Sequence, residues 1–183
     1  MAFGQGVTTV PSGRVYYWAR WADALFSATV LVLNTALIAV PRASTRRNVL
    51  FVGLTAANCI TMASGLMAGF ATAPAPRWTW YGIGVGAYAA VLWMLFLRVP
   101  QEARWQQQAP ARLRLFRRLA RLFIGISALY PLWWIATPLG RGTVGQPTAL
   151  LGFAVLDVLS KAVYGLLLVR AVRRLPDPTA DGM

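Results

Sequence analysis

The chain has 183 residues, of which 57% are hydrophobic and 13% charged, and its formal net charge is +13. A chain of this size and hydrophobicity cannot bury all of its apolar side chains in one small globular core, which excludes an ordinary water-soluble domain. The composition therefore predicts a polytopic membrane protein. With no histidine and one cysteine, Cys59, the chain also lacks the residues for a Ser/His/Asp triad, an intrachain disulfide or a typical transition-metal site. It has no glycine-rich phosphate loop either, and we do not expect an enzyme.

Five apolar segments follow one another along the chain. Each is long enough to cross about 30 Å of hydrocarbon at about 1.5 Å per residue. Short stretches rich in Pro, Gly and Arg separate them, among them Pro100 after the third. The segments cover residues 16–40, 48–72, 78–99, 118–139 and 148–172. The sequence therefore predicts an all-α transmembrane bundle over residues 16–174, an extracellular N-terminal segment 1–15 and a cytoplasmic tail 175–183.

The arginines are divided unequally between the two ends of these segments. Thirteen follow the first, third and fifth segments, whereas the other side has only Arg14, Arg77 and Arg141. By the positive-inside rule this places the N-terminus outside the plasma membrane and the C-terminus in the cytoplasm. Topology thus accounts for the basic charge, and no nucleic-acid partner is expected. The arginine-rich stretch 112–121 is predicted to contact anionic lipid headgroups or to dock a partner.

Polar residues in the first segment share one side of the predicted helix. At about 100° per residue, Asp23 and Asn34 point within about 20° of each other, and Ser27 lies about 40° from Asp23. This gives a polar track about 16 Å long. Arg20 precedes Asp23 by three residues, so we expect it to share the charge of that carboxylate.

The only lysine of the chain, Lys161, lies near the middle of the last apolar segment. A lysine at bilayer depth costs about 2.5 kcal/mol or more unless it is paired, so it indicates a functional site. Asp157 is one helical turn earlier and on the same face. Together with Asp23 and Arg20 these residues form a set with no net charge, as a buried cluster requires. The simpler alternative is a structural ion pair.

Three motifs resemble helices of the microbial rhodopsins, the type 1 or bacteriorhodopsin-like family. Residues 17–23, Tyr-Trp-Ala-Arg-Trp-Ala-Asp, are similar to the third helix, and residues 130–134, Tyr-Pro-Leu-Trp-Trp, to the sixth. Residues 156–161, Leu-Asp-Val-Leu-Ser-Lys, followed by Gly165, are similar to the seventh. The resemblance implies that the five spans match helices three to seven of a seven-helix bundle. An internal gene start or a truncated product is favoured over a natural five-helix protein.

The resemblance also implies a chromophore. All-trans retinal would be bound covalently to Lys161 as a Schiff base, with Asp23 and Asp157 as counterions and Asp23 as the proton acceptor after photoisomerisation. An anion within about 4 to 6 Å is what keeps such a cation protonated in hydrocarbon. Further residues implied at the chromophore are Trp80, Tyr81, Tyr130, Pro131, Trp134, Asn58 and Gly65. Taken alone, each aromatic side chain is ordinary packing, and Asn58 is equally an interhelical hydrogen bond.

Several positions depart from the family pattern. Asn34 stands where efficient outward pumps carry a carboxylic acid that returns a proton to the Schiff base, and Leu139 and Ala149 stand near the glutamates used for fast proton release. These departures predict a slow photocycle. Ala24 and Ser127 occupy places where the family has two tryptophans that sandwich the polyene, which predicts a looser pocket.

Three functions compete on this reading. The favoured one is light-driven proton transfer from a Lys161 Schiff base to Asp23, with slow outward proton transport. The alternative is a sensory photoreceptor that signals through a transducer protein bound at residues 98–121 or at the tail. The second alternative is a non-pigmented degenerate rhodopsin or membrane assembly partner. Chloride pumping is less favoured because Asp23 keeps an anion at the site. Sodium pumping is less favoured because the family's sodium-pump pattern, with Asn before the acid, is not present at Ala19, Arg20 or Trp21. The resemblance implies a small homo-oligomer.

Overall fold

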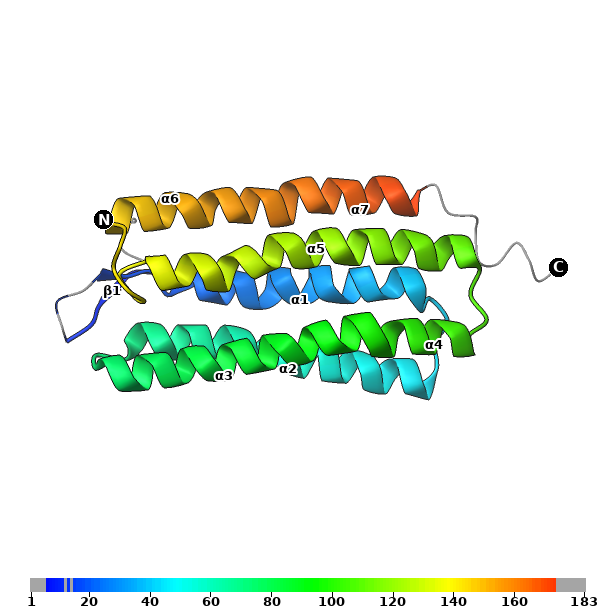
Figure 1. The fold of residues 1–183 in the computed structure, drawn as a ribbon, viewed down its shortest axis with the longest axis horizontal. Coiled ribbons are helices and arrows are strands. Elements are labelled where there is room, and N and C mark those ends of the chain that lie inside the picture. Colours follow the sequence, from blue (N-terminus) through cyan, green and yellow to red (C-terminus); the bar gives the residue numbers. More distant parts are fainter. Residues whose placement is uncertain (1–5, 12, 14, 174–183) are drawn as a thin grey trace.

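Five long helices run side by side in the computed structural model, which describes residues 6–11, 13 and 15–173 (Figure 1). Each helix is long and apolar enough to cross a membrane. They cover Ala19–Ala39, Thr45–Phe70, Pro74–Trp105, Pro110–Ala136 and Gln146–Val172. The predicted all-α bundle with five spans is therefore confirmed. Arg14, residues 1–5 and the predicted tail lie outside the described residues.

The first span begins slightly later than the hydropathy suggested. Two short antiparallel strands, β1 (Thr8–Thr9) and β2 (Val15–Tyr16), precede α1 (Ala19–Ala39). The buried Tyr16 donates a hydrogen bond to the Leu66 carbonyl at 3.1 Å, which holds this hairpin against the end of α2 (Thr45–Phe70). A tyrosine expected in the helix thus belongs to the hairpin that precedes it.

The third span is longer than predicted because Pro100 does not end it. It consists of α3 (Pro74–Trp93), the π-helical turn η2 (Met94–Arg98) and α4 (Val99–Trp105). A proline lacks the backbone N–H that an α-helix interior needs, but it is tolerated in the first turn. Pro100 occupies that place in α4, directly after the widened turn of η2. The sequence prediction of a break at Pro100 was therefore wrong.

The fourth span, α5 (Pro110–Ala136), also starts earlier than residue 118. Pro110 stands in its first turn, where a fixed φ favours helix initiation. The residues from Arg112 to Arg121 consequently lie on the helix itself. Pro131 lies inside the same helix.

The last span is interrupted by a second π-helical turn at its centre. It runs through α6 (Gln146–Asp157), η3 (Val158–Val163) and α7 (Tyr164–Val172). Lys161 lies in η3, and Asp157 is the last residue of α6. Such turns occur often at functional sites because they re-aim the side chains around them.

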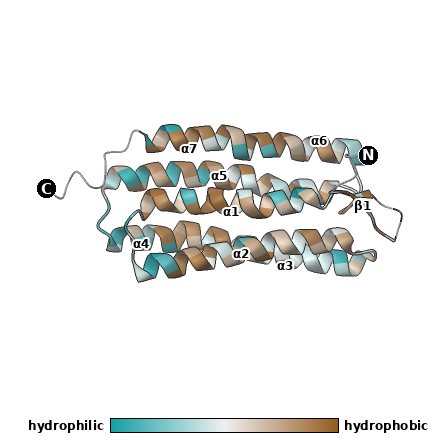
Figure 2. Cartoon of the chain, turned by 180° about the vertical axis from the view of Figure 1, so that it is seen from behind, coloured by the Kyte–Doolittle hydropathy of each residue, from teal (hydrophilic) through white to brown (hydrophobic). Residues whose placement is uncertain are grey.

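The spans form a layered arrangement that positions the site. In Figure 1 the α6–η3–α7 span lies along one edge, α5 and α1 lie next to it, and α2 and α3 lie at the opposite edge. Hydrophobic residues dominate the middle lengths of the helices, and hydrophilic residues gather at their ends (Figure 2). The arginine-rich start of α5 lies at the same end as α4 and the end of α7 (Figure 1).

Candidate functional site

Lys161 brings the first and last spans together. Its Nζ contacts the Oδ2 atom of Asp23 in α1 and lies 3.8 Å from Oδ1 of Asp157. The Lys161 side chain is 30% exposed and that of Asp157 26% exposed, whereas that of Asp23 is 61% exposed. The amine is therefore placed between two carboxylates from different helices, at the middle of the membrane-spanning length.

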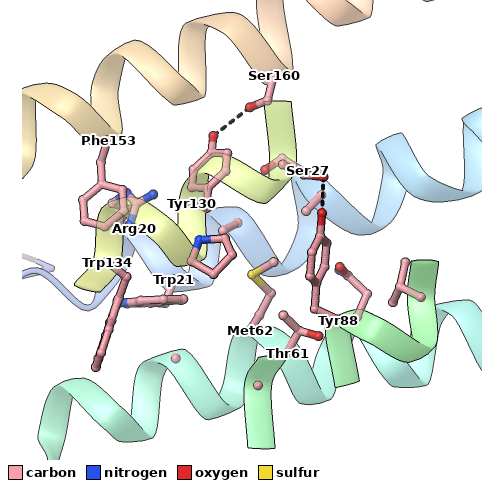
Figure 3. A pocket seen from close by; sticks show the side chains of 18 of the residues that line it. Arg20, Trp21, Ser27, Thr61, Met62, Tyr88, Tyr130, Trp134, Phe153 and Ser160 are labelled. Carbon is pink, nitrogen blue, oxygen red and sulfur yellow. Dashed lines mark hydrogen bonds between the residues drawn. The ribbon is translucent and has the colours of Figure 1, made fainter. Parts of the chain in front are cut away.

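Arg20 does not pair with Asp23, contrary to the expectation from their spacing. Its Nε lies 3.6 Å from Oδ2 of Asp157, and its guanidinium group packs 3.7 Å from the ring centroid of Phe153 (Figure 3). Helical side chains lean toward the N-terminus of their own helix, which carries Arg20 away from Asp23. Arg20 and Lys161 thus share Asp157, while Asp23 faces Lys161.

Asp157 is held in place by neutral groups as well as by charges. Tyr130 of α5 donates a hydrogen bond to Asp157 Oδ1 at 2.7 Å. The same hydroxyl is 2.8 Å from the Oγ atom of Ser160 (Figure 3). Both oxygens of Asp157 are therefore engaged, one by Tyr130 and one by Arg20.

The residues of the predicted polar track on α1 do not all lie at the site. The Ser27 hydroxyl donates to the backbone carbonyl of Asp23 at 2.8 Å, and the Ser27 side chain lines a cavity next to Lys161. Asn34 is about 16 Å from Asp23 along the helix axis and does not line this cavity. The structure thus places Ser27 at the site and Asn34 away from it.

The cavity adjoins Lys161 and is lined by residues of all five spans. Its charged lining residues are Lys161, Asp157 and Arg20, and most of its wall is apolar. Every residue that the family resemblance implied at the chromophore contributes to the lining: Trp80, Tyr81, Tyr130, Pro131, Trp134, Asn58 and Gly65. Ala24 and Ser127 line it too.

Aromatic rings form the cavity wall near the start of α3 and the end of α5. Tyr81 stacks on Trp134 with ring centroids 4.5 Å apart and an interplanar angle of 19°. The Tyr81 hydroxyl donates to the Pro131 carbonyl at 3.1 Å, which fixes the ring against α5. The ring of Trp21 fills the space that a Cβ atom would need at Gly65, so this glycine permits close contact between α1 and α2. The wall is built from flat rings that pack tightly.

Asn58 makes an interhelical hydrogen bond, which is the alternative to a chromophore contact that the sequence had left open. Its Nδ2 donates to Thr29 Oγ1 at 2.8 Å, and Thr29 in turn donates to the Leu25 carbonyl at 2.6 Å. Asn58 therefore links α2 to α1 as well as lining the cavity.

Sequence reasoning placed Ser127 at the pocket but missed the lining residues Tyr88 and Phe153. Tyr88 in α3 (Figure 3) and Ser127 in α5 have hydroxyl oxygens 2.7 Å apart, and both residues line the cavity. Tyr88 follows Tyr81 by seven residues, which places both tyrosines within about 20° on one helix face. That spacing was a usable signal. The contribution of Phe153, by contrast, depends on packing between α6 and α1 and leaves no such pattern.

Comparison with known proteins gives consistent relatives over nearly the whole chain. A sequence model of the family described as "Bacteriorhodopsin-like protein" matches residues 1–175. Bacteriorhodopsin of Haloterrigena sp. (strain arg-4) is 33% identical over 187 residues, covering 98% of this chain and 72% of that protein. Archaerhodopsin-1 of Halorubrum ezzemoulense is 32% identical over 185 residues, covering 98% of this chain and 68% of that protein.

Solved structures show the same fold. The thermophilic rhodopsin from Rubrobacter xylanophilus is 36% identical and superposes with a TM-score of 0.83, covering 93% of this chain and 73% of that chain. A light-driven proton pump from Leptosphaeria maculans is 26% identical with a TM-score of 0.79, covering 96% of this chain and 75% of that chain.

Proposed function

Because the chain belongs to the bacteriorhodopsin-like family of microbial rhodopsins, we propose that light drives the transfer of a proton from a Schiff base at Lys161 to Asp23. The cofactor of this family is all-trans retinal, bound covalently through a lysine. Lys161 is the only lysine of this chain. The observation that carries the proposal is the direct contact between Lys161 Nζ and Asp23 Oδ2 beside a largely apolar cavity.

The residues at the cavity fit a long apolar chromophore. Lys161 and Asp157 line the cavity on the side of η3 and α6, Arg20 lines it from α1, and the lining residues of α2 and α3 carry no charge. The stacked rings of Tyr81 and Trp134 offer flat apolar surfaces of the kind that a conjugated chain packs against. A cavity with one reactive amine and aromatic walls suits a retinoid aldehyde better than a polar ligand.

The charged residues have separate tasks in this mechanism. Retinal, when linked to Lys161 Nζ as a protonated Schiff base, supplies visible absorption and a light-driven change of shape. Asp157 has both oxygens engaged by Tyr130 and Arg20, so it serves as a fixed negative charge. Asp23 Oδ2 touches the amine directly and is in place to take its proton. The Ser27 hydroxyl, bonded to the Asp23 carbonyl, steadies that turn of α1.

The two sides of Lys161 differ in polarity, which supports slow transport in one direction. Toward α4 the described part of the bundle is packed with apolar side chains, including Val32, Leu95 and Val99, each at most 2% exposed. Asn34 lies on this side and has no proton to give. Proton return from the arginine-rich end is therefore slow, and by the positive-inside rule that end faces the cytoplasm. Net movement would be outward.

The first test is a pigment assay on the chain as given. Membranes containing the protein are incubated with all-trans retinal, and the visible spectrum is recorded beside that of Lys161→Ala. A hydroxylamine-bleachable band that requires Lys161 supports the proposal. A folded protein that forms no band would contradict retinal binding.

A second measurement distinguishes transport from sensing. Intact cells carrying the pigment are illuminated, and the external pH is followed with and without an uncoupler. Outward transport acidifies the medium, and the uncoupler abolishes the change. A stable pigment that produces no pH change would favour the sensory alternative.

A further inference from the structure

The side of the cavity formed by α3 carries a pair of hydroxyl groups. Tyr88 Oη in α3 (Figure 3) and Ser127 Oγ in α5 are 2.7 Å apart, and both side chains are partly buried at the cavity wall. Thr61 of α2 is a third hydroxyl-bearing residue of the lining, close to Tyr88 in the same view. None of these residues belongs to the charged cluster around Lys161. Their role is not explained by proton transfer to Asp23.

The layered arrangement of the helices places Tyr88 of this pair across the bundle from the span that carries the amine. Lys161 is in the α6–η3–α7 span, and α3 lies at the opposite edge of the bundle, with α1 and α5 between them (Figure 1). An extended ligand attached to Lys161 therefore passes between α1 and α5. Its far end meets α2 and α3 at Thr61, Gly84 and Tyr88, which line the cavity there. For retinal, that far end is the ring.

The hydrogen-bond directions show what these hydroxyls can still accept. Ser127 Oγ donates its hydrogen to the Ile124 carbonyl at 3.2 Å, so Tyr88 is the donor in the pair with Ser127. Thr61 Oγ1 donates to the Ala57 carbonyl at 2.9 Å. All three hydrogens are used within the protein, and the oxygen lone pairs remain. The wall is thus ready to accept a hydrogen bond and needs a donor from the ligand.

We propose that Tyr88 and Ser127 determine chromophore specificity by binding a hydroxyl group on the ring of the retinoid. This inference rests on the proposed function, since it assumes that a retinoid is attached at Lys161. A ring hydroxyl supplies the missing donor, whereas a ring ketone has only lone pairs and gains nothing from the same wall. Unsubstituted retinal still fits, because Tyr88 and Ser127 satisfy each other when no ligand donor is present.

A purely structural role makes a different prediction. If the hydrogen bond between Tyr88 and Ser127 served only to hold α3 against α5, its loss would weaken the binding of every retinoid by the same factor. Specificity, in contrast, appears in the ratio of two binding constants measured on one protein preparation. The ratio is insensitive to a general loss of stability, so it separates the two roles.

The experiment is a titration of the full chain in membranes with three aldehydes. All-trans retinal, all-trans 3-hydroxyretinal and all-trans 4-oxoretinal are added to the wild type, to Tyr88→Phe and to Ser127→Ala, and half-saturation is read from the visible band. Thr79→Val is the matched control, because Thr79 is an exposed residue of α3 whose hydroxyl donates to Ala75 at 3.0 Å. It removes a hydroxyl from the same helix away from the cavity.

The wild type and Thr79→Val should bind 3-hydroxyretinal about 3- to 10-fold more tightly than retinal, the range for one net hydrogen bond. They should bind 4-oxoretinal no more tightly than retinal. Tyr88→Phe and Ser127→Ala each remove one of the two acceptors, so each should lower the ratio toward one while retinal binding persists, and either variant provides the reading if the other fails to fold. Equal binding of all three aldehydes by the wild type would overturn the inference and leave the proposed function standing. No band with any aldehyde would overturn both.

Discussion

Lys161 and Asp23 are 138 residues apart in the chain and form an ion pair between the last and the first span. In lipid, an isolated ammonium or carboxylate is costly, and pairing is what allows both to remain at this depth. The pair also fixes the orientation of η3 relative to α1. The central feature of the site is therefore a contact that joins the first and the last span of the chain.

Asp23→Asn should separate pigment formation from proton transfer. The variant keeps Lys161 and the cavity, so the visible band should form, but at longer wavelength because the counter-charge beside the amine is gone. Light-induced acidification should disappear, since an amide cannot accept the proton. The measurement is the absorption spectrum together with the pH change of illuminated cells.

Two companion variants give that prediction its controls. Asp23→Glu keeps a carboxylate and should retain some acidification. Asp157→Asn should shift the band while leaving Asp23 able to accept the proton. Undiminished acidification by Asp23→Asn would contradict the assigned acceptor.

Arg20→Gln should destabilise the bundle, because it removes the cation that faces Asp157 Oδ2. The side chains of Arg20 and Asp157 are only 19% and 26% exposed, so water compensates poorly for the loss. We expect a decrease of about 1 to 3 kcal/mol in the free energy of unfolding. Unfolding in mixed detergent micelles measures it. Arg114→Gln, an exposed residue of α5, is the matched control and should change stability by less than about 0.5 kcal/mol.

Much of the site could be predicted from the sequence because charged residues in apolar segments are rare. Lys161, Asp157, Asp23 and Arg20 were recognisable for that reason, and the helical repeat placed Lys161 and Asp157 on one face. The partner of Arg20 was not predictable in the same way. It depends on the direction of a long side chain and on the ring of Phe153, which belongs to a distant helix.

The wrong helix boundary at Pro100 also arose because the sequence does not show the local helix geometry around that residue. Pro100 looks like a helix breaker in the sequence, but the preceding π-helical turn at η2 places it in the first turn of α4, where proline is tolerated.

The pair of Tyr88 and Ser127 joins residues of α3 and α5 that are 39 positions apart in the sequence. Local patterns describe one helix at a time, so they could not reveal which hydroxyls meet between two helices.

Gly65→Ala should reduce retinal binding through Trp21. A Cβ atom at Gly65 would overlap the Trp21 ring, which lines the cavity, so the ring must move into the space the chromophore needs. We expect at least a tenfold weaker half-saturation by retinal, corresponding to about 1.4 kcal/mol or more. Titration of the visible band measures the effect.

The control for that substitution is Gly86→Ala in α3. A Cβ atom at Gly86 would meet no other atom within 4 Å, so the change is harmless to packing. Alanine should instead favour the helix by up to about 1 kcal/mol. Equal retinal binding by Gly65→Ala and the wild type would show that the Trp21 ring has room to adjust.

Thr35 and Tyr164 should behave asymmetrically when they are replaced. Both side chains are 0% exposed, and their hydroxyl oxygens are 2.6 Å apart within an apolar cluster. Thr35 Oγ1 donates to the Leu31 carbonyl at 2.6 Å, so the Tyr164 hydroxyl is the donor in the pair. Tyr164→Phe leaves no donor unpaired and should cost about 0.5 to 1 kcal/mol. Thr35→Val strands the buried Tyr164 hydroxyl and should cost about 1 to 3 kcal/mol.

The double variant provides the decisive comparison. With Val at position 35 and Phe at position 164, no buried hydroxyl is left without a partner, so the double variant should be more stable than Thr35→Val alone. The free energies of unfolding of all four proteins, measured in the same mixed micelles, form a double-mutant cycle. If the two single losses simply add, the hydroxyls do not depend on each other. Equal losses in the two single variants would contradict the donor direction inferred from the Leu31 carbonyl.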